Sequence, residues 1–160
     1  ARAKAFAMRI VVWSRSRTEA RAAALGVIRA ATIEDAVREA DAVSVHLTLG
    51  PETRGRIGES VFNAMKPGAI LVNTARGPVV DEEALVAALG SGRLGAAGLD
   101  VYEREPRLAR GLARMPRVVL LPHLGSATVE ARRAMAVRAA DNLIRALSGR
   151  RPGDLLNPSP

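Results

Sequence analysis

The chain has 160 residues, of which 48% are hydrophobic and 25% charged, a balance typical of one globular domain. It contains no cysteine, which excludes disulfides and thiol chemistry and makes a cytoplasmic location our expectation. The net charge is +8, yet the arginines are scattered and only 2% of residues are aromatic, so we expect no nucleic-acid partner. No apolar run is long enough to cross a membrane, and the N-terminus lacks the pattern of a secretory signal.

The first part of the chain predicts two strands with two helices between them. The apolar run Met8–Trp13 is typical of a buried strand, and Thr18–Leu25 is a helical pattern that Gly26 can end. A second helix is predicted over Thr32–Ala40, where the Thr32 side chain can cap the N-terminus. The next strand is predicted over Ala42–Leu47.

The remainder continues the alternation. We expect helices over Ser60–Met65, Asp81–Leu89 and Ser126–Leu147, strands over Ala69–Asn73, Ala96–Val101 and Arg117–Leu121, and an extended tail, Pro152–Pro160, that leaves the domain. The strands are almost continuously hydrophobic, which predicts a parallel sheet covered by helices on both faces. The expected fold class is therefore α/β.

Three polar residues stand at the ends of apolar runs, namely Arg76, Glu105 and His123. Ligands of parallel α/β sheets bind outside the carboxyl ends of the strands, so these side chains can meet in one crevice. Arginine can hold a carboxylate in a fork, glutamate can orient a histidine, and histidine can transfer a proton. This set suits the reduction of a 2-keto acid.

Three long motifs resemble the D-isomer-specific 2-hydroxyacid dehydrogenases, especially their glyoxylate/hydroxypyruvate reductase branch. They are KPGAILVNTARGPVVDEEAL at 66–85, GLDVYEREP at 98–106 and LPHLGSAT at 121–128. Their order and spacing are far more specific than a lone glycine motif. The resemblance covers nearly all of the chain.

The resemblance implies a Rossmann-like, doubly wound parallel sheet that is incomplete here. The family's first strand, its Gly-rich phosphate loop and most of its substrate domain have no counterpart, and the missing strand would lie between Met8–Trp13 and Ala42–Leu47. Residues 1–147 are thus expected to form a partial NAD(P)-binding domain, and 148–160 a tail leading toward the missing substrate domain. A homodimer is implied for the full-length parent.

The resemblance also assigns catalytic roles. Arg76 would bind the substrate carboxylate and polarise the keto oxygen, and His123 would donate the proton. Glu105 would orient His123 and favour its protonated form. Glu103 is a competing candidate for that role, but only Glu105 precedes proline as in the family motif.

The expected cofactor contacts fall at the same strand ends. Asp100 resembles the acid that binds the nicotinamide carboxamide, and the other nicotinamide positions are Thr74, Ala75, Arg76, His123, Leu124 and Gly125. After the first strand, Ser14, Arg15 and Ser16 replace the acid of NAD-preferring folds, which favours NADP over NAD. Arg15 is a better phosphate ligand than Arg17, and the alternative is a basic turn without a ligand.

Around His46 the chain departs from the family pattern, since Thr48 replaces a proline and Gly50 a threonine beside the expected adenosine pocket. We interpret His46 as structural. No Cys/His cluster or pair of acids suggests a metal site.

The resulting hypothesis is an oxidoreductase portion that transfers hydride between NADP(H) or NAD(H) and a small 2-keto/2-hydroxy acid such as glyoxylate or hydroxypyruvate. The alternative is a truncated, non-catalytic fragment or a partner-binding module of the same fold.

Overall fold

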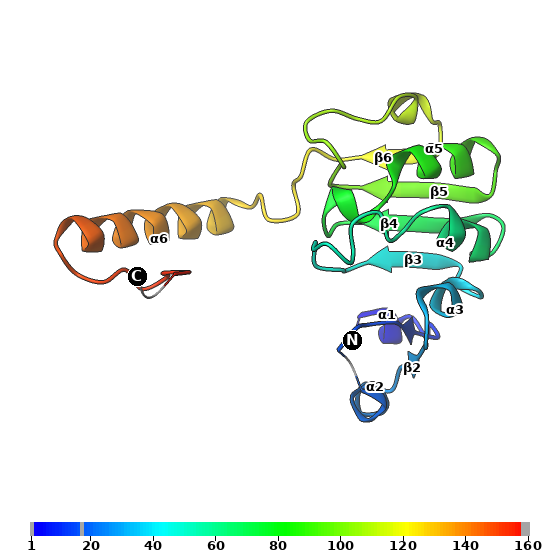
Figure 1. Ribbon diagram of the computed structural model, residues 1–160, viewed down its shortest axis with the longest axis horizontal. Coiled ribbons are helices and arrows are strands. Elements are labelled where there is room, and N and C mark those ends of the chain that lie inside the picture. Colours follow the sequence, from blue (N-terminus) through cyan, green and yellow to red (C-terminus); the bar gives the residue numbers. More distant parts are fainter. Residues whose placement is uncertain (1, 17, 158–160) are drawn as a thin grey trace. The chain divides into compact units, whose positions relative to one another are not determined.

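Helices and strands alternate along most of the chain (Figure 1). The computed structural model describes residues 2–16 and 18–157. Contacts divide the chain into an N-terminal unit, Ala1–Pro122, and a C-terminal unit, His123–Pro160, each described by itself below. The elements of the N-terminal unit are α1 (Arg2–Ala5), β1 (Val11–Val12), α2 (Glu19–Leu25), β2 (Ile28–Arg29), α3 (Ile33–Val37), β3 (Ala42–Val45), α4 (Glu59–Ala64), β4 (Ala69–Asn73), η1 (Gly77–Val79), α5 (Glu82–Gly90), β5 (Leu94–Leu99), η2 (Leu112–Arg114) and β6 (Val118–Leu120). The C-terminal unit contains α6 (Val129–Leu147).

The largest sheet is parallel, with strand order β3-β4-β5-β6. Its register places Asn73, the last residue of β4, beside Leu99, the last residue of β5. The carboxyl ends of these two central strands are therefore level. Residues that follow them emerge at the same edge of the sheet, which confirms the predicted α/β class and its Rossmann-like arrangement.

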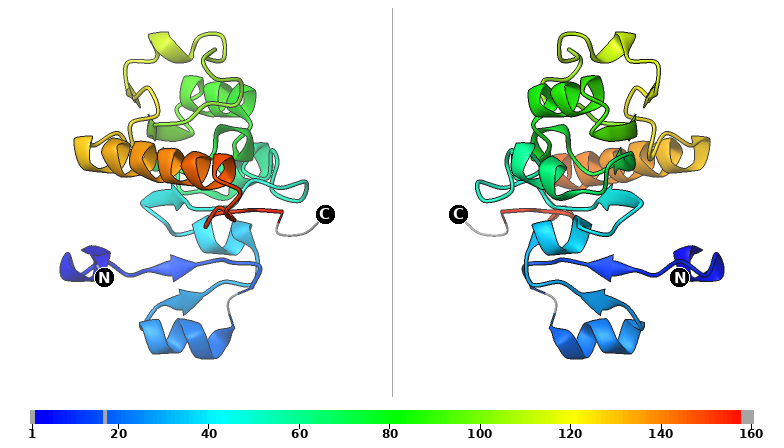
Figure 2. Two further views of the ribbon diagram at one scale, coloured as in Figure 1. Left: turned by 90° about the vertical axis from the view of Figure 1, so that its left-hand side faces the viewer. Right: turned by 90° about the vertical axis from the view of Figure 1, so that its right-hand side faces the viewer.

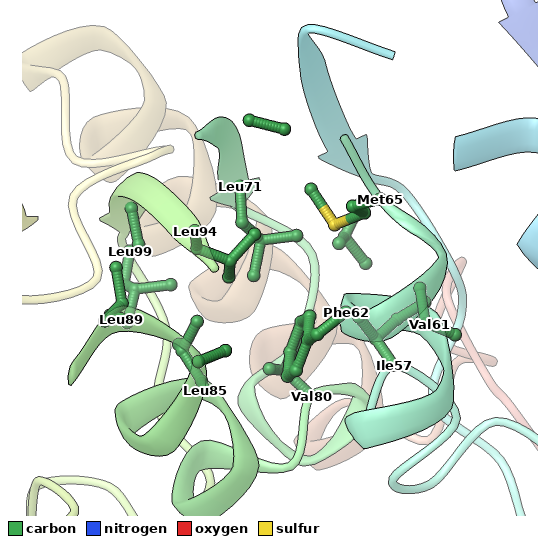
Figure 3. Packing of buried hydrophobic residues seen from close by; sticks show 14 of the residues in the cluster. Ile57, Val61, Phe62, Met65, Leu71, Val80, Leu85, Leu89, Leu94 and Leu99 are labelled. Atoms are coloured by element: carbon green, nitrogen blue, oxygen red, sulfur yellow. The ribbon is translucent and has the colours of Figure 1, made fainter. Parts of the chain in front are cut away.

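The core lies between this sheet and the helices α3, α4 and α5. Figure 3 labels the side chains that α4, α5 and the strands contribute to it. Phe62 from α4 and Leu85 from α5 are almost fully buried, as are Leu71 from β4 and Leu94 from β5. Burying such side chains contributes about 1.5–3 kcal/mol each to stability. This packing fixes the strand ends that carry the site.

Within the N-terminal unit, the side chains on the two faces of the sheet differ in exposure. In β4 the burial alternates, and Ile70 is 43% exposed; in β6, Val119 is 62% exposed. Side chains of α3, α4 and α5 pack into one core with the buried face. The long helix α6 belongs to the C-terminal unit, so coverage of both faces by helices stays a prediction.

The strands β1 and β2 form a separate parallel pair, with α2 beside them (Figure 2). The N–H of Ile28 donates to the carbonyl of Ile10 at 2.9 Å, and the N–H of Ala30 to that of Val12 at 2.9 Å. The sequence did not predict β2 or α1. The division into two sheets agrees with the prediction that the sheet is interrupted between Met8–Trp13 and Ala42–Leu47.

Polar side chains cap the helix N-termini at the positions that the sequence favours. The hydroxyls of Thr18 and Thr32 and the carboxylate of Asp81 each accept a backbone N–H three residues later. Gly26 ends α2 with a φ of 58°, a left-handed conformation that glycine adopts without strain. In the C-terminal unit Thr128 is the cap, so α6 starts later than the predicted Ser126.

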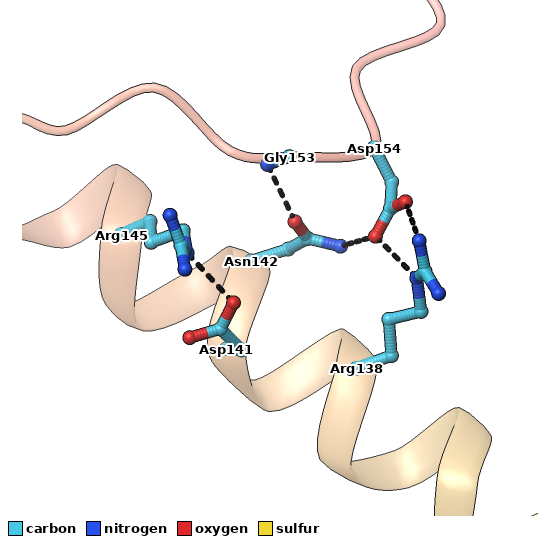
Figure 4. Close-up of polar contacts among 6 residues, drawn as sticks. All are labelled: Arg138, Asp141, Asn142, Arg145, Gly153 and Asp154. Atoms are coloured by element: carbon cyan, nitrogen blue, oxygen red, sulfur yellow. Dashed lines mark hydrogen bonds and ion pairs between the residues drawn. The ribbon is translucent and has the colours of Figure 1, made fainter.

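Side chains of α6 hold the first residues of the C-terminal tail (Figure 4). That the tail as a whole leaves the NAD(P)-binding domain stays a prediction. Both oxygens of Asp154 accept from the Arg138 guanidinium, with Nε at 2.7 Å from Oδ2. Asn142 donates to Asp154 at 2.8 Å and accepts from the N–H of Gly153 at 3.0 Å. Among the described residues, no helix combines the length and apolar character needed to span a membrane.

Candidate functional site at the carboxyl ends of β4 and β5

The turn that carries Arg76 is fixed by the last residue of β4. Asn73 is buried, and its Nδ2 donates to the carbonyl of Arg76 at 3.1 Å. Its Oδ1 accepts from the N–H of Ala75 at 3.0 Å. The Arg76 side chain is exposed, and Nη1 donates to the Ala75 carbonyl at 2.7 Å. An exposed guanidinium on a fixed turn is suited to bind a carboxylate in a fork.

Asp100 and Thr74 lie at this same edge. The N–H of Asp100 donates to the Asn73 carbonyl at 3.0 Å, which extends the pairing of β4 and β5 by one residue. Asp100 is buried, whereas Thr74 is exposed and Ala75 half-buried. The structure thus brings together the residues predicted to face the nicotinamide from β4 and β5.

Gly77 brings the turn after β4 into direct backbone contact with the segment after β5. A Cβ atom at this position would overlap the carbonyl group of Tyr102 and the backbone nitrogen of Glu103. Only glycine permits this approach. Arg76 precedes the contact by one residue, and Glu105 follows Tyr102 by three, so the two predicted catalytic residues belong to segments that pack together.

Glu105 folds back onto its own loop. Its Oε1 accepts from the N–H of Tyr102 at 3.0 Å, and the side chain is otherwise at the surface. The competing Glu103 is held differently, because its backbone N–H donates to Oε1 of Glu82 at 2.7 Å. A surface carboxylate on the loop that packs against the Arg76 turn can orient an imidazole, as proposed below.

The side chain of Tyr102 ties this loop to the chain that leads out of β6. Its hydroxyl donates to the Leu121 carbonyl at 2.7 Å, and the Leu99 carbonyl lies at 3.3 Å. Burial raises the pKa of Tyr102 above its usual value, so the hydroxyl stays protonated and keeps its proton to donate. Leu121 stands two residues before His123 in the sequence.

His123 is the first residue of the C-terminal unit, so its meeting with Arg76 and Glu105 is a proposal. It is exposed and has a φ of 56°, in the left-handed region that residues other than glycine rarely adopt. Such conformations cluster at functional sites. Leu124 and Gly125 follow it and are exposed. The other histidine, His46, is exposed and shares a hydrogen bond with Ser44 at 2.8 Å.

The predicted phosphate end follows β1. Ser14 is half-buried, while Arg15 and Ser16 are exposed; Arg17 lies outside the described residues. The guanidinium of Arg15 forms an ion pair with Glu52 at 2.6 Å. The loop that carries Glu52 is shaped by a buried hydroxyl, because Thr53 donates to the Thr48 carbonyl at 2.7 Å and accepts from the N–H of Gly50 at 2.9 Å.

Three residues that hold the site were not singled out from the sequence, namely Asn73, Glu82 and Tyr102. All are buried: Asn73 ends β4, Glu82 begins α5, and Tyr102 lies in the loop after β5. A polar residue directly after an apolar run was the available signal for Asn73, but nothing separated Glu82 from its exposed neighbour Glu83. Among the described residues, no group of three His, Asp or Glu side chains could hold a metal ion.

Comparisons with known proteins identify the family and the fold. Over residues 1–125 the chain matches the family described as D-isomer specific 2-hydroxyacid dehydrogenase, NAD binding domain. It is 45% identical over 156 residues to a glyoxylate reductase of Thermococcus litoralis, covering 98% of this chain and 47% of that protein. It is 50% identical over 128 residues to glyoxylate/hydroxypyruvate reductase B of Klebsiella pneumoniae, covering 79% of this chain and 39% of that one.

A solved structure shares the fold over almost the whole chain. An NADPH-dependent glyoxylate/hydroxypyruvate reductase of Sinorhizobium meliloti, in complex with NADP and malonate, superposes with a TM-score of 0.84 at 35% identity. The match covers 99% of this chain and 47% of that one. The chain therefore spans about half the length, or less, of these relatives. It belongs to the D-isomer-specific 2-hydroxyacid dehydrogenase family, whose NAD-binding domain it matches over residues 1–125.

Proposed function

We propose that the protein carrying this chain transfers a hydride between NADP(H), or NAD(H), and a small 2-keto/2-hydroxy acid such as glyoxylate or hydroxypyruvate. The observation that carries this proposal is the backbone contact at Gly77, which packs the Arg76 turn against the loop of Glu105. The segments that carry the Arg76 guanidinium and the Glu105 carboxylate thereby meet at one edge of a parallel sheet. Folds of this kind bind ligands at that edge.

The reaction adds hydride to the keto carbon and a proton to its oxygen. Arg76 would hold the substrate carboxylate and stabilise the negative charge that develops on the oxygen. His123 would give that oxygen its proton and take it back in the oxidative direction. Glu105 would accept a hydrogen bond from the other ring N–H of His123 and so keep the imidazole oriented.

The residues present fit a nicotinamide cofactor. Its nicotinamide, when bound, supplies or accepts the hydride. Asp100, buried at the end of β5, would bind the carboxamide, while Thr74, Ala75, Leu124 and Gly125 would line the ring. Arg15 is exposed after β1 and would bind the 2′-phosphate of NADP together with Ser14 and Ser16, since a guanidinium is a strong partner for a phosphate.

The wider organisation is part of the same proposal. Residues 1–147 would form the partial NAD(P)-binding domain, and 148–160 would lead toward a substrate domain. The glyoxylate reductase names of the relatives support an enzyme that acts on a small organic acid. A cytoplasmic location, for which the absence of cysteine speaks, and a homodimer of the longer protein remain predictions.

Single-residue substitutions in the complete gene product test the proposed function. Wild-type protein should oxidise NADPH in the presence of glyoxylate, followed by absorbance. Arg76→Ala should lower kcat/KM about 10²–10³-fold, because it removes stabilisation of the developing charge. His123→Asn should lower kcat about 10²–10⁴-fold, because it removes the proton donor.

Two variants serve as matched controls. Arg114→Ala removes another exposed arginine of the N-terminal unit, and His46→Asn removes the other histidine; both should keep wild-type kcat/KM. Absence of wild-type activity across a panel of 2-keto acids, or full activity in Arg76→Ala, would contradict the proposal.

A further inference from the structure

Glu82 is a buried acid that the proposed reaction does not use. It lies in the first turn of the nine-residue helix α5 and is only 4% exposed. An acid is favoured at a helix N-terminus, but that interaction does not require burial. The exposed Glu83 beside it gains from the same helix end without being buried. The burial of Glu82 therefore needs another explanation.

That explanation lies in its two carboxylate oxygens, which hold both ends of the loop after β5. Oε1 accepts from the N–H of Glu103 at 2.7 Å, and Oε2 accepts from the N–H of Ala109 at 3.1 Å. Glu105 lies between these two anchored residues. An ionised carboxylate is the side chain that can accept both bonds, since it carries two acceptor oxygens and no donor.

These bonds complete a set of three contacts between the segment 73–82, which carries Arg76, and the segment 100–109, which carries Glu105. The first is the backbone hydrogen bond from Asp100 to Asn73. The second is the close approach of Gly77 to Tyr102. Glu82 supplies the third and is the contact that reaches past Glu105 to Ala109.

We propose that Glu82 is a positioning residue that sets the loop of Glu105 against the turn of Arg76. This rests on the proposed function, in which those two side chains act on one substrate. Glu82 touches neither substrate nor cofactor in this role. It acts through Glu105, by fixing the backbone on each side of it.

Glu82→Gln tests the role in the complete gene product. The glutamine amide presents an N–H group where a backbone N–H needs an acceptor, so at least one anchor is lost. We expect kcat for glyoxylate reduction to fall on the order of 10-fold, as small misplacements of catalytic groups do, with KM for NADPH unchanged. Glu83→Gln is the matched control, with the same change of charge on the next residue, and should behave as wild type.

Two further measurements separate positioning from a general loss of structure. In a double-mutant cycle, Glu82→Gln should add little to the loss of kcat already caused by Glu105→Gln. The reason is that both substitutions act through the Glu105 carboxylate. An equal loss with Glu105 present or absent would overturn the proposal. Glu82→Asp, which keeps the charge but reaches less far, should give an intermediate kcat.

Amide hydrogen exchange provides a readout that does not depend on activity. In Glu82→Gln the amides of Glu103 and Ala109 should exchange faster, while that of Leu71 in β4 stays protected. Unchanged exchange at both loop amides would overturn the anchoring role. An inactive wild-type protein with faster loop exchange in the variant would instead reject the proposed function and retain the anchor.

Discussion

In the proposed function Arg15 binds the 2′-phosphate of NADP, and the structure gives its guanidinium a competing partner. Its ion pair with Glu52 is exposed, with side-chain exposures of 53% and 72%. Pairs of this kind contribute only about 0–1 kcal/mol. A phosphate bears more negative charge than one carboxylate, so it can displace Glu52 from Arg15 at a small cost.

We therefore expect Glu52→Gln to strengthen binding of NADPH. Removal of the competing charge should lower KM for NADPH by up to about five-fold, the equivalent of about 1 kcal/mol, and leave KM for NADH unchanged. Initial rates with each cofactor measure the effect. Glu39→Gln is the control, because Glu39 forms a similarly exposed pair with Arg9 at the same 2.6 Å. Equal changes for NADPH and NADH would exclude Arg15 as the phosphate ligand.

At the scale of elements, the contact between α6 and the tail depends on one carboxylate. Hydrogen bonds from Arg138 and then Asn142 lower the pKa of Asp154 from 3.8 to about 2. Because the folded value lies below the ordinary one, the contact is fully stabilised above about pH 4. It loses that stabilisation as the pH falls toward 2.

NMR titration of the Asp154 carboxyl carbon measures this dependence. At pH 3.8, where an ordinary aspartate is half protonated, Asp154 should still be ionised. Arg138→Ala should move its midpoint back toward 3.8, because it removes the larger of the two hydrogen-bonding causes. A wild-type midpoint at 3.8 would show that the contact with α6 is absent in solution.

The elements that sequence patterns located best are those with strong local signals. The strand Ala69–Asn73 has the predicted bounds, and α6 ends at Leu147 as expected. The strand β2 was missed because only Ile28 and Arg29 pair with β1, too short a run for a periodic pattern. Coverage of both faces of the sheet stays a prediction, because hydrophobic strands indicate burial without showing which helix provides it, and α6 belongs to the C-terminal unit.

For the candidate site, the residues with chemistry in their side chains were predicted and those that hold them were not. Arg76, Asp100 and Glu105 were proposed as site residues because the motifs that contain them resemble motifs of the family. Tyr102 and Glu82 act through backbone groups of a distant segment. Their partners follow from the three-dimensional path of the chain, which no local pattern in the sequence encodes.

At the scale of the whole molecule, a thermal melt separates the dehydrogenase function from the non-catalytic alternative. If the chain carries a working site, far-UV circular dichroism should show cooperative unfolding, and NADPH at about 100 times its Kd should stabilise the chain by about 2.7 kcal/mol. That corresponds to a rise of about 5–10 °C for a domain of this size. Arg15→Ala is the control and should reduce the rise. A featureless melt that NADPH leaves unmoved would favour a fragment or partner-binding module.

The backbone contact between Gly77 and Tyr102 also bears on how this enzyme class can be recombined. Because no methyl group fits between these two turns, we expect them to be exchangeable between homologues only as a pair. A chimera that grafts only one of them from a homologue with a different backbone path would create a collision or a void. Transferring residues 73–82 and 99–109 together should preserve the fit. A library of variants made to accept other 2-keto acid substrates should therefore vary both stretches at once.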